Sequence, residues 1–179
     1  MGASPANIAV WVNDRFVCVK IAGRAGCACS VDFRSLILGL RTRGWRHFIL
    51  DLTECQLMDS TFLGVLAWLG LRFSEEAGPL PATIELLNPS DRVSGLLENL
   101  GVAQLFQVSR GAPIATDALE PLPQTTLEAN RSEIQRTSLE AHQLLIHVDP
   151  KNGAKFKDVC KFLEEDLKKM ERKDDAPAS

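Results

Sequence analysis

The chain has 179 residues, of which 45% are hydrophobic and 24% charged, with a formal net charge of −3. This length suits one well-cored domain plus an appendage, and the composition is that of a soluble globular protein rather than a disordered or fibrous one. A negative net charge provides no overall attraction to nucleic acid or to an anionic membrane, so we expect neither as a partner.

The N-terminal residues and the cysteines both indicate a cytoplasmic protein with reduced thiols. No signal-peptide pattern and no apolar run of membrane-spanning length occurs, so we expect a cytoplasmic protein without membrane insertion. The five cysteines are odd in number and lie mostly in apolar segments, where free thiols behave as small hydrophobic side chains. Neither the C-x-C of Cys27 and Cys29 nor the three histidines show metal-ligand spacing, so we expect no metal and no cofactor.

The first third of the chain predicts a hairpin and an amphipathic helix. Residues 8–12 and 16–21 are strand-like and flank a turn formed by Asn13 and Asp14. Ser30 is the expected N-cap of the following helix, which Gly44 would end. The apolar stripe of this helix consists of Phe33, Leu36, Ile37 and Leu40.

Strands and helices then alternate. The expected order is a strand at 47–52, a helix at 61–76, a strand at 83–88, a helix at 90–101 and a short strand at 103–108. Because a strand–helix–strand crossover makes its two strands parallel, we predict an α/β domain. Its mixed sheet would have four to five strands with helices packed on it, and the domain would span residues 1–108.

The remaining residues differ in composition. Residues 109–125 carry three prolines and are predicted to be a linker, followed by a helical extension at 126–173 and a disordered tail at 174–179. In the extension, residues 155–170 form a helix with an apolar stripe that something must cover. Either the extension folds as an intramolecular helical hairpin, or this helix binds a partner or a second copy of the chain and makes a homo-oligomer.

Three polar residues, Asp59, Ser60 and Thr61, lie between a strand-like run and the apolar helix at 61–76. Unpaired backbone N–H groups and the positive end of the helix dipole favour an anion at such a position. A phosphate on Ser60 would add about −1.5 to −2 charge at pH 7, and the adjacent amides could accept it. Alternatively, Asp59 or Ser60 only caps the helix and contributes about 1 kcal/mol.

The segment "FILDLTECQLMDSTFLGVLAWLG", Phe48 to Gly70, resembles the signature of the STAS domain family, the bacterial anti-sigma factor antagonists and their relatives. The segment "IELLNPSDRVSGLLENLGVAQLF", Ile84 to Phe106, is similar to the later strand, helix and short strand of that family. The resemblance covers about Ile8 to Val108. It implies a STAS-like sheet flanked by helices, with function by binding and no catalytic centre.

The resemblance also implies a phosphorylation switch. Ser60 would be phosphorylated by a partner serine kinase that is also an anti-sigma factor, and a phosphatase would remove the phosphate; Thr61 is the alternative acceptor. Unphosphorylated protein would hold the partner, and a charged group beside Asp59 would release it. The implied partner-binding residues are Asp59, Ser60, Thr61, Phe62 and Gly64.

The chain departs from the family pattern at two places. Phe62 stands where the family usually has glycine, and the helical region from Thr126 onward is absent from the usual single-domain antagonist. The alternative interpretation is therefore a non-phosphorylated STAS scaffold, or a protein associated with a transporter or another complex, that assembles through its C-terminal helices. No nucleophile, base and orienting group can be assembled from the motifs, so we expect no enzyme.

Overall fold

The computed structural model describes residues 6–76, 80–123 and 129–174. Residues 175–179 of the predicted tail lie outside this range. The strands are β1 (Asn7–Val12), β2 (Val17–Ala25), β3 (His47–Asp51), β4 (Cys55–Met58), β5 (Thr83–Leu87), β6 (Gln107–Ser109) and β7 (Glu120–Leu122). The helices are α1 (Cys27–Thr42), α2 (Ser60–Ser74), α3 (Asp91–Asn99), α4 (Arg131–Val148) and α5 (Gly153–Asp174), with short 3-10 helices η1 (Ala103–Leu105) and η2 (Pro150–Asn152).

The strands form one mixed sheet in the order β6-β5-β3-β2-β1-β7. β1 and β2 are an antiparallel hairpin, whereas β2, β3, β5 and β6 are parallel neighbours. The predicted mixed α/β fold is thus confirmed. The sheet has seven described strands, more than the four to five expected, because β7 adds to β1 and β4 adds to the second part of β2. β2 changes partner from β3 to β4 around Gly23, whose φ of 81° favours glycine.

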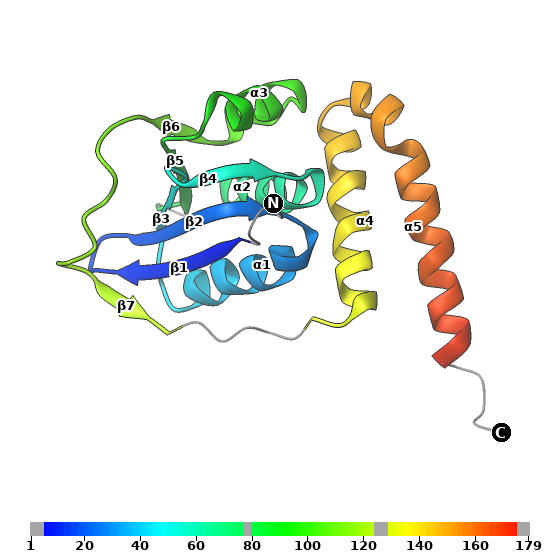
Figure 1. Ribbon diagram of the computed structural model, residues 1–179, viewed down its shortest axis with the longest axis horizontal. Helices are drawn as coiled ribbons and strands as arrows, with labels where there is room; N and C mark the ends of the chain where they lie inside the picture. Colours follow the sequence, from blue (N-terminus) through cyan, green and yellow to red (C-terminus); the bar gives the residue numbers. More distant parts are fainter. Residues whose placement is uncertain (1–5, 77–79, 124–128, 175–179) are drawn as a thin grey trace.

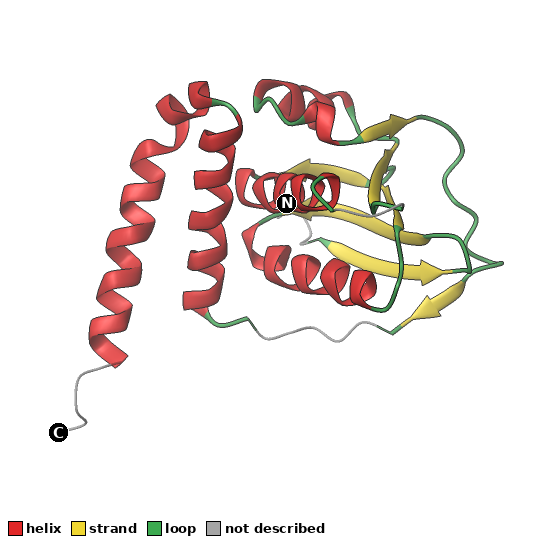
Figure 2. Cartoon of the chain, turned by 180° about the vertical axis from the view of Figure 1, so that it is seen from behind, coloured by secondary structure: helices red, strands yellow, loops and turns green. Residues whose placement is uncertain are grey.

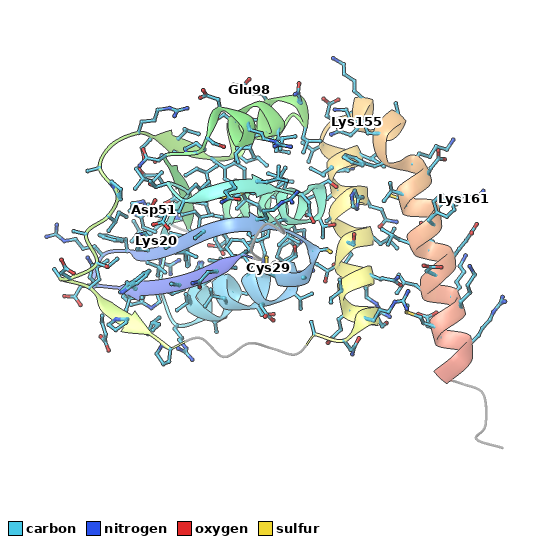
Figure 3. All side chains as sticks on the ribbon, in the orientation of Figure 1. Lys20, Cys29, Asp51, Glu98, Lys155 and Lys161 are labelled. Atoms are coloured by element: carbon cyan, nitrogen blue, oxygen red, sulfur yellow. The ribbon has the colours of Figure 1, made fainter. Side chains whose placement is uncertain are left out.

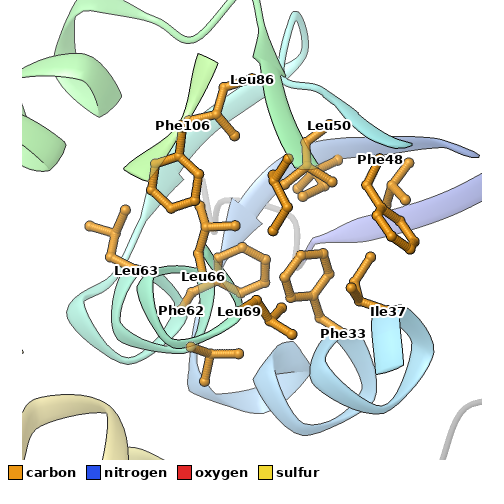
Figure 4. Close-up of a cluster of buried hydrophobic side chains, with 14 of the residues drawn as sticks. Phe33, Ile37, Phe48, Leu50, Phe62, Leu63, Leu66, Leu69, Leu86 and Phe106 are labelled. Carbon is orange, nitrogen blue, oxygen red and sulfur yellow. The ribbon is translucent and has the colours of Figure 1, made fainter. Parts of the chain in front are cut away.

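Helices α1 and α2 lie side by side over one face of the sheet (Figures 1 and 2). Their aromatic side chains meet in the core, where the rings of Phe33 and Phe62 have centroids 4.7 Å apart (Figure 4). Phe48 of β3 stacks on Phe73 of α2 in the same core. Burial against the sheet, α1 and α4 explains why most of α2 is apolar around its whole circumference.

The start of α1 differs from the prediction. The helix begins at Cys27 with Gly26 as N-cap, so Ser30 lies inside the helix and does not cap it. The Ser30 hydroxyl instead donates a hydrogen bond to the Gly26 carbonyl at 2.9 Å, four residues back. The prediction was wrong because no residue of the local segment supplies the cap.

The C-terminal helices α4 and α5 form a helical hairpin. A capping box between Asn130 and Glu133 starts α4, and η2 turns the chain into α5. Helix α4 stands across the ends at which α1 and α2 begin, and α5 packs on its outer side (Figures 1 and 2). Figure 3 shows Lys161 of α5 pointing away from the body of the molecule. Helix α4 therefore provides most of the hairpin's contact with the α/β layer, to which α5 adds a hydrogen bond from Lys155 to the Asn99 carbonyl of α3 at 3.0 Å.

Within residues 6–76, 80–123 and 129–174, no helix combines the length and the apolar character that a membrane span needs.

We predict that Phe62→Ala lowers the free energy of unfolding by about 3–5 kcal/mol, because the ring is fully buried and its removal leaves a cavity. Phe162→Ala is the matched control, since the Phe162 ring on α5 is 68% exposed. Its cost should stay below about 0.5 kcal/mol. Urea unfolding of both variants measures the difference, and equal costs would contradict this description of the core.

Candidate functional site

The carboxylate of Asp59 caps two helices at once. Its Oδ1 accepts the backbone N–H of Phe62 in the first turn of α2, and its Oδ2 accepts the N–H of Cys27 at the start of α1, both at 2.8 Å. The backbone N–H of Asp59 donates to the Ala25 carbonyl at the end of β2. A Cβ on Gly26 would lie 2.6 Å from Oδ2, so glycine is needed for this close approach. Asp59 therefore fixes where both helices begin.

Ser60 is the first residue of α2, and its hydroxyl is not used as a cap. Its Oγ lies 2.8 Å from Nε2 of His142 in α4. The other ring nitrogen of His142, Nδ1, is 2.7 Å from the Ser138 carbonyl, which can only accept, so Nδ1 carries the proton. In the neutral ring Nε2 is then the acceptor, and the Ser60 hydroxyl donates to it.

Two further contacts attach α4 to the first turns of α2. The Thr61 and Ser138 hydroxyl oxygens are 2.8 Å apart and share a hydrogen bond. Gly64 lies against Ala141, because a Cβ on Gly64 would stand 2.6 Å from the Ala141 carbonyl oxygen and 2.7 Å from its Cβ. Small side chains on both helices thus permit a close approach of the two backbones.

A charged contact lies at the edge of the same interface. Arg34 of α1 forms an ion pair with Glu140 of α4 at 2.7 Å, and its guanidinium carbon is 4.2 Å from the centre of a Trp68 ring of α2. Both charged side chains remain partly exposed, so this pair contributes at most about 1 kcal/mol. It joins all three helices at one point.

His142 is held in an environment that disfavours its charged form. The residue is 4% exposed, and the Phe156 ring of α5 lies edge-on to the imidazole with centroids 4.9 Å apart. Burial lowers the pKa of His142 below its ordinary value, although the Ser138 carbonyl and the Asp59 charge act in the opposite direction. The imidazole is therefore neutral at neutral pH and can accept from Ser60.

The structure places the predicted site residues in different surroundings. Asp59 and Ser60 are partly buried at the start of α2, and Thr61 and Gly64 are buried where α4 covers them. Phe62 points into the core with no exposed surface. The ring therefore packs beneath the first turn of α2 on its core side, and it does not lie on the surface that carries the Ser60 hydroxyl.

Sequence reasoning missed the residues of α4 that contact this turn. His142 and Ser138 follow Ser60 and Thr61 by 82 and 77 positions, respectively. Ser138, Ala141, His142 and Leu145 are spaced i, i+3, i+4 and i+7, so all four residues share one face of α4. This spacing is the signal of their role that the sequence carries. No motif assigns that face to the start of α2.

The pairing of a hydroxyl with a neutral imidazole also occurs in serine nucleophiles. Here α4 and α5 enclose the imidazole, and the Ser60 hydroxyl serves as a contact between two helices. Within the part of the chain that the structure describes, no group of three or more His, Cys, Asp or Glu residues could hold a metal ion. The arrangement serves as a contact between α2 and α4.

We predict that Asp59→Ala costs about 2 kcal/mol of unfolding free energy, because two helices lose a cap. Ser90→Ala is the matched control, since the Ser90 hydroxyl caps only α3 by accepting the N–H of Val93. Its cost should be about 1 kcal/mol. Chemical unfolding of both variants gives the comparison, and an Asp59→Ala cost no greater than that of Ser90→Ala would contradict the double cap.

We predict a pH dependence of stability that originates at His142. Its pKa is lower in the folded than in the unfolded chain, so the unfolded chain binds the proton more readily as the pH falls. The contribution of His142 to the free energy of unfolding is complete at pH values above its ordinary pKa of 6.5. It decreases as the pH falls below that value, by at most about 1.4 kcal/mol per pH unit. Unfolding curves at pH 7.5, 6.5 and 5.5 should show a smaller loss for His142→Gln; equal losses would refute the assignment.

Comparison with known proteins gives a distant similarity. No family model matches the chain. Anti-sigma-B factor antagonists from Staphylococcus aureus strains NCTC 8325 / PS 47, COL and N315 are each 26% identical to it over 108 residues. The match covers 60% of this chain and 96% of each relative. The similarity suggests a relationship to the anti-sigma factor antagonists, and it leaves about two fifths of this chain unmatched.

Proposed function

We propose that this protein is an anti-sigma factor antagonist of the STAS type, a cytoplasmic binding module in a partner-switching pathway. In its unphosphorylated form it binds an anti-sigma factor that is also a serine kinase, and phosphorylation of Ser60 releases that partner. The observation that carries the proposal is the position of Ser60 at the first residue of α2, where Asp59 already caps the helix. The name of the distant relatives supports the same function.

A phosphate at Ser60 is compatible with the fold. The caps of α1 and α2 use the Asp59 carboxylate and do not involve the Ser60 hydroxyl, so both helix starts survive the modification. The positive end of the α2 dipole favours an anion at its first turn. The phosphate would also place about two negative charges beside Asp59, which changes the charge of the surface that a partner contacts.

Ser60 is a better acceptor than Thr61. The Thr61 side chain is 4% exposed, and its hydroxyl shares a hydrogen bond with Ser138 inside the α2–α4 contact. Ser60 is only partly buried. A kinase therefore has to uncover less of the protein to reach Ser60.

The second candidate function is a non-phosphorylated scaffold that assembles through the C-terminal helices. It is favoured by Val159 and Phe162, two exposed apolar residues three positions apart on α5. Such a pair could contact a second copy of the chain or another complex.

The proposed function predicts conditional phosphorylation of Ser60. In protein isolated from its own cells, grown with and without stress, mass spectrometry should find phosphate on Ser60 at an occupancy that changes with conditions. Thr61→Ala should leave this phosphate in place, whereas Ser60→Ala should remove it. Absence of phosphate in every condition would contradict the proposal.

Capture experiments on the same cells identify the partner. Ser60→Ala protein should retain a serine kinase or anti-sigma factor, and Ser60→Glu should retain at least tenfold less of it. If both variants retain the same proteins through α5, with binding lost in Phe162→Ala, the scaffold function is the correct one.

A further inference from the structure

The C-terminal hairpin occupies the surface that the proposed function assigns to the partner. Helix α4 binds the Ser60 hydroxyl through His142 and the Thr61 hydroxyl through Ser138. It also covers Gly64, leaving no room for a methyl group. A partner that contacts the first turns of α2 would have to occupy the same space as α4 (Figure 1).

The contact of α4 with the rest of the chain is polar near Ser60 and apolar at Ala141 and Leu145, two buried residues of α4 that belong to the core. Near Ser60 it consists of hydrogen bonds between hydroxyl and imidazole groups, small side chains, and the partly exposed Arg34–Glu140 ion pair. The polar part of this contact resembles the interfaces between domains that separate. The aromatic core, by contrast, is formed between α1, α2 and the sheet, as in the pairs Phe33–Phe62 and Phe48–Phe73.

The lengths of the relatives indicate that the sheet and its first helices are sufficient for an antagonist. They match this chain over 108 residues, which is 96% of their own length. Here the fold from β1 to the end of β6 spans residues 7–109, and the hairpin lies beyond it at 131–174. A protein of the relatives' size cannot hold both parts. The hairpin is therefore an addition that lies over the site.

We propose that the α4–α5 hairpin is an inhibitor in cis. In its docked position it keeps the partner, and with it the partner's kinase activity, away from Ser60. The hairpin must leave α2 before the partner can bind there or phosphorylate Ser60. The nature of the excluded partner rests on the proposed function, whereas the docking of the hairpin on Ser60 does not. The chain then has three states: docked, open and unphosphorylated, and open and phosphorylated. Only the second binds the partner.

Phosphorylation and docking oppose each other at Ser60. In the transfer, Ser60 Oγ forms a bond to the γ-phosphorus of ATP, the bond from that phosphorus to the bridging oxygen breaks, ADP leaves, and the hydroxyl proton passes to the kinase. The product has no hydroxyl proton to donate to Nε2 of His142, a residue that is 4% exposed. Because such coupling is reciprocal, a docked hairpin that disfavours the phosphate is itself displaced by the phosphate.

A disulfide can report the docked state in the full chain. Thr61→Cys with Ser138→Cys places two sulfurs where hydroxyl oxygens lie 2.8 Å apart, so mild oxidation should link them only when α4 is docked. Peptide mapping separates this bond from pairs that involve the exposed Cys27. The protein is prepared with serine or with co-translationally inserted phosphoserine at position 60, and circular dichroism verifies that both forms are folded.

We expect the serine form to cross-link and the phosphoserine form to cross-link at least tenfold more slowly. Ala141→Asp, which enlarges the side chain facing Gly64, should slow cross-linking to a similar extent. Ala154→Asp is the matched control on the exposed surface of α5 and should have no effect. Equal cross-linking rates for the serine and phosphoserine forms would overturn the proposal; they would follow if His142 paired with the phosphate. A serine form that fails to cross-link would also overturn it.

A second measurement uses the kinase captured by the Ser60→Ala protein. The oxidised double-cysteine protein should bind this kinase at least tenfold more weakly than the same protein after reduction. Equal binding would overturn inhibition in cis and leave the proposed function intact. Conversely, absence of Ser60 phosphate in cells would contradict the proposed function. The cross-linking rates need no partner, so they would still decide whether a charge at Ser60 displaces the hairpin.

Discussion

The arrangement of this protein depends on one carboxylate that accepts hydrogen bonds from the first turns of two helices. Asp59 connects the start of α1 to the start of α2, and its own backbone is tied to the end of β2. Two helix dipoles therefore point their positive ends at one negative charge. Because Asp59 satisfies both helix starts, the neighbouring Ser60 hydroxyl is free to bond with another part of the chain.

That freedom connects the fold to the proposed regulation by phosphorylation. A serine used as a cap would lose its structural role when phosphorylated, whereas Ser60 can gain a phosphate while both helices keep their cap. In this chain the hydroxyl instead bonds His142, which burial keeps neutral and therefore able to accept. The same oxygen atom is thus the proposed acceptor of the phosphate and the donor of a hydrogen bond to the hairpin. Once phosphorylated, it can no longer donate that hydrogen bond to His142.

Local patterns were sufficient to predict most of the fold and the position of Ser60. The buried run of β3 and the polar group before α2 mark a strand and a helix start through spacing and residue type alone. The start of α1 was misplaced because its cap, Asp59, is 32 positions away from Cys27. The pairing of Ser60 with His142 was missed for the same reason, since a single sequence carries no signal for contacts between distant polar residues.

In the proposed switch, a phosphate on Ser60 and a docked hairpin exclude each other. Small-angle X-ray scattering of the full chain, with serine and then with phosphoserine at position 60, tests it most directly. We expect a larger radius of gyration and a broader distance distribution for the phosphoserine protein, because α4 and α5 separate from the α/β layer. Identical scattering from the two folded proteins would contradict it.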